Sequence, residues 1–241
     1  MSNILDDFKK TNNYFDENKK KIVEKYGDHI TEFEKIYNQI VKNIPPIKIS
    51  ATLGTALALQ YRALKFLYSA FRLVLEGHTY EAMMLVRNTL ELRIIALDMG
   101  FNKEAYDLWR IAQDAKEYLK KRDGGTIDSK KLKKILKEKS GKNIINNMSF
   151  RASFQRAKIN LVLLNRVNQI ILSHGEISEY ISHESIFNLV RRINIVKIAP
   201  EKEQVEIYMG YDASSNLEPF LQSIIKELKD LLSDIQLVAQ N

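Results

Sequence analysis

Hydrophobic residues recur at helical spacing through the first 44 residues of the chain. An apolar side chain at every third or fourth position marks one face of an amphipathic helix. The pattern predicts one very long helix, or two helices broken near Gly27-Asp28, where Asp28 would cap the second. Pro45-Pro46 ends this segment, because proline cannot continue a helix. We expect residues 1–45 to form a long helix or helical pair that can serve as a dimerisation element.

Three further helices follow in close succession. Ser50 can cap a helix over residues 51–76, which Gly77 ends. The next helix covers residues 78–99, and Asn102 can cap another that runs to about Lys121.

The helix over residues 78–99 is apolar on nearly every side, which is typical of a helix in the protein interior. Arg87 and Glu91 nevertheless lie one turn apart on it, with Asp98 two turns further along. Buried charges need partners. The helix therefore holds either a chemical site or a structural ion network, and the sequence leaves both open.

The second half of the chain contains a lysine-rich helix over residues 129–142, with a narrow apolar stripe formed by Leu132, Ile135 and Leu136. A longer helix is predicted from Phe150 through Leu172. The elements expected after it are a polar loop with a short helix over about 173–190, a small β-hairpin over about 193–210, and a last helix over about 215–238.

These elements predict a mainly α protein, a helical bundle of about six to seven helices with a small β-hairpin before the C-terminal helix. Residues 50–241 would form the bundle domain. Only 9 Gly and 4 Pro occur in 241 residues, which favours long helices. The absence of cysteine removes disulfides and thiolate chemistry.

The net charge of +7 is concentrated in one segment. Residues 116–142 carry eleven Lys or Arg and four Asp or Glu, so this stretch alone supplies the whole surplus. A neutral body with one basic arm indicates a local contact with a polyanion or a well-solvated helix face.

Several classes of protein are not expected. The start of the chain does not resemble a secretory signal, and no uninterrupted apolar run reaches about 18 residues, so we expect a cytoplasmic protein with no membrane partner. No phosphate-binding glycine loop or catalytic-motif signature occurs, so we expect no nucleotide cofactor and no other cofactor.

Two of the four histidines lie in similar settings, Ser173-His174-Gly175-Glu176 and Ser182-His183-Glu184-Ser185. A histidine with carboxylate and hydroxyl neighbours can act as a general base. The same residues can equally form a hydrogen-bonded turn. A metal site is not expected, because dinuclear carboxylate bundles need Glu-x-x-His on two helices.

The run from Gln60 to Glu91, with its glycine turn and Arg-x-x-x-Glu helix, resembles a family of uncharacterised prokaryotic all-helical proteins of unknown function. The chain also resembles, more distantly, the HEPN helical bundles of toxin and antiphage systems. Members of that group cleave RNA without a metal, using an arginine and a histidine.

The resemblance implies a protein of toxin or antiphage defence that binds or cleaves RNA, as a metal-independent ribonuclease if it is an enzyme. Arg87, Glu91 and His183 would form the catalytic site if they meet in the fold. The expected phosphate-contacting residues are Lys130, Lys131, Lys133, Lys134 and Lys137. The alternative is a non-enzymatic homo-oligomeric interaction module, a homodimer in which Arg87 and Glu91 are a structural pair.

Overall fold

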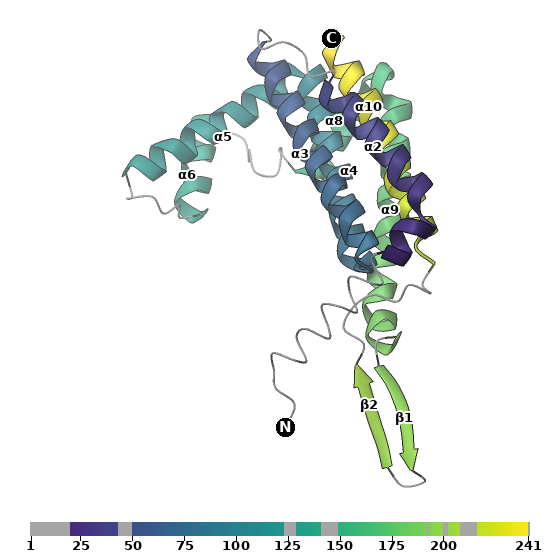
Figure 1. Cartoon of the computed structure of the whole chain (residues 1–241). Helices are drawn as coiled ribbons and strands as arrows, with labels where there is room; N and C mark the ends of the chain where they lie inside the picture. The colour runs from purple at the N-terminus through teal and green to yellow at the C-terminus, as the bar shows by residue number, and fades with distance from the viewer. Residues whose placement is uncertain are drawn as a thin grey trace. The chain divides into compact units, whose positions relative to one another are not determined.

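The structure is a computed structural model of the chain. It describes residues 20–42, 50–122, 129–140, 149–191, 193–199, 202–207 and 216–240. These residues are mainly helical, which confirms the prediction of a mainly α protein (Figure 1). The helices are α2 (Gly27–Lys42), α3 (Ala51–Leu75), α4 (Thr79–Phe101), α5 (Lys103–Arg122), α6 (Ser129–Ser140), α8 (Phe150–Ile159), α9 (Leu161–Arg191) and α10 (Glu218–Ala239).

The helix boundaries follow the capping signals in the sequence. The Ser50 hydroxyl accepts a hydrogen bond from the backbone N–H of Leu53 at 3.2 Å, and the Asn102 side chain accepts one from Glu104 at 3.0 Å. Gly77 adopts φ of 77°, a conformation that other residues rarely take, and so ends α3. Helical residues 20–25 precede α2 across a turn at Tyr26, close to the predicted break.

Two predictions about the third quarter of the chain were wrong. The helix expected over residues 150–172 ends at Ile159, and a second helix starts at Leu161, because the Asn160 side chain accepts the N–H of Val162 at 3.0 Å. The loop expected after Leu172 is instead helix, since α9 continues to Arg191. Apolar residues at helical spacing, such as Ile170 and Ile177, remain buried through this segment and outweigh its polar composition.

Strands β1 (Ile193–Ala199) and β2 (Lys202–Ile207) pair in antiparallel fashion, with Ile193 opposite Ile207 and Ala199 opposite Lys202. The pairing is irregular between Lys197 and Ala199. The side chains of both strands lie outside the described residues.

The chain divides into two compact units, each assembled from separate segments of sequence. The first unit comprises residues 1–44, 64–88 and 174–230. The second comprises residues 45–63, 89–173 and 231–241. The division into residues 1–45 and 50–241 stays a prediction.

Aromatic packing and polar contacts join the helical segments of the first unit. Phe33 on α2 stacks on Phe71 of α3, with ring centroids 4.0 Å apart. Tyr26 accepts a hydrogen bond from the backbone N–H of Leu217 at 3.0 Å, immediately before α10 begins. Tyr180 of α9 meets Phe220 of α10 edge-on at 5.4 Å. Each of these contacts joins segments that are distant in sequence.

The second unit contains the lysine-rich helix α6, which lies beside α5 (Figure 1). Their shared core is apolar, and it includes the predicted stripe residues Leu132 and Leu136. The α5 residues of this core are Leu108, Ala112, Ala115 and Leu119. The helix α6 therefore packs on α5 through a narrow stripe, and the lysine side chains that the structure describes on it are exposed.

None of the helices in the described ranges is both long enough and apolar enough to cross a membrane.

Candidate functional site

In the first unit the structure brings Arg87 of α4 into contact with His174 of α9. The Nε of Arg87 donates to Nε2 of His174 at 3.4 Å. On the opposite side of the imidazole ring, Nδ1 lies 3.5 Å from the hydroxyl of Ser178, one turn further along α9. All three side chains are partly buried, so the cluster is held in place and still reaches solvent. We call these three residues the Arg87–His174 cluster.

The contact between Arg87 and His174 favours one tautomer of the imidazole. A guanidinium is always protonated and can only donate, so Nε2 of His174 must present a lone pair. A neutral imidazole with a lone pair on Nε2 carries its hydrogen on Nδ1, which can donate to the Ser178 hydroxyl. In this tautomer the imidazole presents its Nε2 lone pair to a permanent positive charge.

The sequence pointed to a different histidine. His183 lies nine residues beyond His174 on α9, which is about 13–14 Å along the helix axis, and its side chain lies outside the described residues. The meeting of Arg87 and His183 therefore stays a prediction. Glu91 lies one turn after Arg87 on α4 and is half-buried. A signal for His174 was present in its serine and glutamate neighbours, which it shares with His183.

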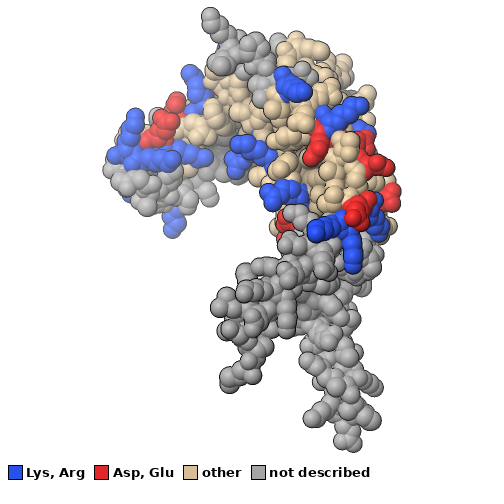
Figure 2. Space-filling model, in the orientation of Figure 1, with Lys and Arg blue, Asp and Glu red and all other residues tan. Residues whose placement is uncertain are grey.

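The basic helix α6 presents Lys130, Lys131, Lys134 and Lys137 as exposed side chains. Figure 2 shows Lys and Arg side chains gathered over the end of the second unit that α5 and α6 form. Lys134 lies 4.0 Å from Glu138, and both are well exposed, so the pair is weak. The side chain of Lys133 lies outside the described residues.

The fully buried charges of α4 are Arg93 and Asp98, both in the second unit. Arg93 donates its Nε hydrogen to Asp234 of α10 at 2.6 Å, and Arg166 of α9 donates to the other oxygen of the same carboxylate. The side chains of Arg93 and Asp234 are 1% and 0% exposed. Two guanidinium groups therefore hold one carboxylate in a closed ionic cluster.

Asp98 is held by Arg156 of α8, which donates from Nε at 3.0 Å and from Nη2 at 2.6 Å. Burial raises the pKa of Asp98, and the ion pair with Arg156, together with hydrogen bonds from Ser153 and Asn102, opposes part of this rise. A carboxylate surrounded in this way has no face open to a substrate.

We interpret both buried clusters as structural struts that link α4 to α8, α9 and α10 within the second unit. The sequence left open whether the charges of this apolar helix form a chemical site or an ion network, and in the structure Arg93 and Asp98 form ion pairs. Asp234 could have been found from its spacing, because it lies three residues after Leu231 and seven after Glu227, on the buried face of α10. Arg156 and Arg166 carry no such signal in the sequence.

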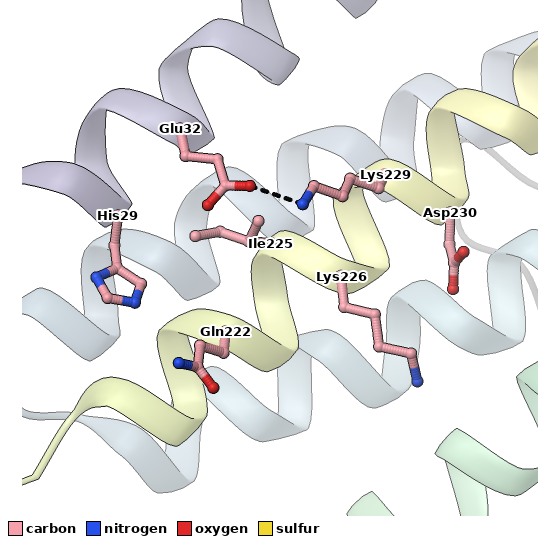
Figure 3. A pocket seen from close by; sticks show the side chains of 7 residues that line it. All are labelled: His29, Glu32, Gln222, Ile225, Lys226, Lys229 and Asp230. Carbon is pink, nitrogen blue, oxygen red and sulfur yellow. Dashed lines mark ion pairs between the residues drawn. The ribbon is translucent and has the colours of Figure 1, made fainter.

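A cleft of about 350 Å³ lies between α2 and α10 in the first unit (Figure 3). The cleft lining includes Lys226, Lys229, Glu32 and Asp230, so positive and negative side chains balance. Lys229 is already paired with Glu32 at 2.6 Å, as the dashed line shows. Such a lining has no net charge with which to select an anion or a cation.

Within the described ranges, no three His, Asp or Glu side chains gather as a metal site would require. Comparison of the chain with protein-family models, curated proteins and solved structures found no match. The resemblance to the all-helical family and to HEPN bundles therefore stays a prediction.

Proposed function

We propose that this protein binds RNA and cleaves it at the Arg87–His174 cluster without a metal. The proposal rests on the contact between a guanidinium and an imidazole, brought together from α4 and α9 with both groups reachable from solvent. Guanidinium binds phosphate with paired hydrogen bonds. Neutral imidazole is the commonest general base in proteins.

The chemistry needs only groups that the cluster and the RNA supply. A phosphodiester that binds Arg87 competes for the Nε hydrogen and releases the lone pair on Nε2 of His174. That lone pair takes the proton of the ribose 2′-hydroxyl, whose oxygen then attacks phosphorus. The bond from phosphorus to the 5′-oxygen breaks, and the imidazolium returns its proton to that oxygen. The products are a 2′,3′-cyclic phosphate and a 5′-hydroxyl.

The other two residues predicted for the catalytic site, Glu91 and His183, are also part of the proposal. Glu91 would orient the guanidinium of Arg87, and His183 would be a second proton carrier. The basic helix α6 would bind the RNA backbone through its exposed lysines, since phosphate contacts supply most of the affinity for nucleic acid. Involvement in toxin or antiphage defence belongs to the same proposal.

The assay that tests this proposal follows cleavage of a labelled single-stranded RNA by the full chain in the presence of EDTA. We expect cyclic-phosphate products. His174→Ala should lower the cleavage rate by about 100-fold or more, because a general base contributes at least about that factor. His29→Ala is the matched control, as another partly buried histidine of the first unit. Arg87→Lys keeps the charge, loses the Nε donor and should also be slow.

The His183→Ala variant in the same assay decides between the two histidines. Equal activity of His174→Ala and wild type, with normal thermal unfolding, would remove the Arg87–His174 cluster from the mechanism. Loss of activity in His183→Ala alone would return the catalytic role to the histidine that the sequence indicated.

One observation favours the alternative of a homo-oligomeric interaction module, for which a cytoplasmic homodimer is the simplest form. Ile159, Leu161 and Val162, around the junction of α8 and α9, are 82%, 86% and 64% exposed. Adjacent large apolar side chains at such exposure are typical of interaction surfaces. Leu161→Glu should then shift the mass measured by light scattering to that of a monomer, and an unchanged mass would contradict this alternative.

A further inference from the structure

The exposed face of α3 in the first unit carries a tyrosine between two cations. Lys65, Tyr68 and Arg72 are spaced by three and four residues, so they are successive neighbours along one face of the helix. Tyr68 is 43% exposed, and the Arg72 side chain is 62% exposed. This order of cation, ring and cation is the feature that the lysine helix α6 lacks, because α6 contains no aromatic residue.

The ring of Tyr68 is held in place by two aromatic side chains of α2. Tyr37 of α2 lies 5.3 Å from it between ring centroids, and Phe33 lies 6.4 Å away. Phe33 is itself buried and stacked on Phe71. A tyrosine ring that is held by neighbouring aromatic side chains loses little conformational entropy when another flat group stacks on its open side.

The acidic residue beside this face is weakly engaged. Glu76 lies 3.7 Å from Arg72, and both side chains are more than one-third exposed, so the pair contributes little and can be exchanged for a phosphate. Arg72 and Glu76 also line a small hollow of about 70 Å³ with Ile22 and Val23. This hollow places Arg72 at the border between helical residues 20–25 and the α3 face.

We infer that this face, which we call the α3 stacking surface (Tyr37, Lys65, Tyr68 and Arg72), binds single-stranded RNA. A base would stack on Tyr68, and the flanking phosphates would contact Lys65 and Arg72. Aromatic rings with adjacent cations are typical of single-strand binding, because each unpaired base has a face to stack and each linkage a charge to neutralise. A double helix keeps its bases stacked inside and cannot use the ring.

This inference rests on the proposed function and adds a preference for unpaired RNA. The α6 lysines can contact the backbone of a single strand or a duplex, since both present phosphates. The α3 stacking surface would favour the single strand alone. The two surfaces therefore differ in what their removal does to the two forms of RNA.

The test measures fluorescence anisotropy of the full chain with a 12-nucleotide oligouridine and with a duplex RNA of the same length. We expect Tyr68→Leu to weaken oligouridine binding about tenfold and to leave duplex binding unchanged, as expected for the loss of one base stack. Tyr68→Phe keeps the ring and should bind like wild type. Tyr118→Leu removes another exposed tyrosine, on α5, and should also bind like wild type.

The outcomes separate the two claims. If the wild-type chain binds neither RNA, the proposed function fails and the inference fails with it. If the wild type binds oligouridine and Tyr68→Leu binds it equally well, only the α3 stacking surface is wrong. If Tyr68→Leu instead changes the mass of the protein in light scattering and not its RNA binding, the surface is a contact between copies of this chain, which also overturns the inference.

Discussion

Arg93 on α4 donates its Nε hydrogen to Asp234 on α10 at 2.6 Å, and this contact joins residues 141 positions apart in the sequence. Neither side chain reaches solvent. Arg166 uses the other oxygen of the same carboxylate. One buried carboxylate therefore accepts hydrogen bonds from two arginines within the second unit.

Replacing Asp234 by asparagine should destabilise the protein strongly. The change leaves Arg93 buried without its counter-charge, which costs about 3–5 kcal/mol. The free energy of unfolding, measured by urea denaturation, should fall by that amount. Glu32→Gln breaks an exposed pair and is the control, with an expected loss below about 1 kcal/mol. Similar small losses in both variants would contradict the closed ionic cluster.

The pKa of Asp98 provides a second prediction. Burial holds it above its ordinary value of 3.8, while Arg156 lowers it. The carboxyl therefore favours its protonated form on folding. Its contribution to stability is full below about pH 3.8 and is lost as the pH rises through the raised pKa.

Carboxyl NMR titration of Asp98 measures this directly. We expect a pKa above 3.8 in wild type and a higher one in Arg156→Gln, because that variant removes the largest opposing influence. A wild-type pKa below 3.8 would show that the ion pair outweighs burial.

The continuity of α9 can be tested at Gly175. This residue lies inside the helix, and a Cβ added there would meet no atom within 4 Å. Gly175→Ala should therefore raise the free energy of unfolding by about 0.5–1 kcal/mol, because alanine loses less backbone entropy in a helix. No gain would favour the loop that the sequence predicted.

Gly100 is the matched comparison for Gly175. It also lies in a helix, but a Cβ there would be 3.2 Å from Val238 and 3.7 Å from Ala56. The tight contact with Val238 should cancel the gain, so Gly100→Ala should be less stable than Gly175→Ala.

Charge removal on α6 should change the salt dependence of RNA binding. Replacing the four exposed lysines by glutamine should weaken binding. It should also reduce the slope of log affinity against log salt concentration by about 3, because each phosphate contact with a single strand contributes about 0.7 to that slope. The lysines to change are Lys130, Lys131, Lys134 and Lys137. A control set of exposed lysines is Lys20, Lys21, Lys35 and Lys42, whose loss should leave the slope near that of wild type. Equal slopes in all three proteins would remove α6 from the binding surface.

Much of the fold could be predicted because it depends on local signals. Ser50, Gly77 and Asn102 bound helices through hydrogen bonds and backbone conformations formed within a few residues. The helix α9 was misread because its polar run suggested a loop. Its remaining apolar positions are sparse, and their burial depends on tertiary packing.

The candidate site was harder to predict, because a contact between α4 and α9 is a property of the tertiary fold. The sequence indicated Arg87 together with His183, a contact that stays a prediction, whereas the structure brings Arg87 to His174. The choice between His174 and His183 depends on which turn of α9 lies beside α4. No pattern within either segment contains that information.

The most direct test of the account is the tautomer of His174, measured by two-bond ¹⁵N–¹H correlation NMR at alkaline pH in the full chain. The contact with Arg87 predicts hydrogen on Nδ1 and a bare Nε2, and Arg87→Gln should lose this preference. Hydrogen on Nε2 in the wild-type protein, unchanged in Arg87→Gln, would show that the guanidinium does not meet this imidazole and would contradict the proposed site.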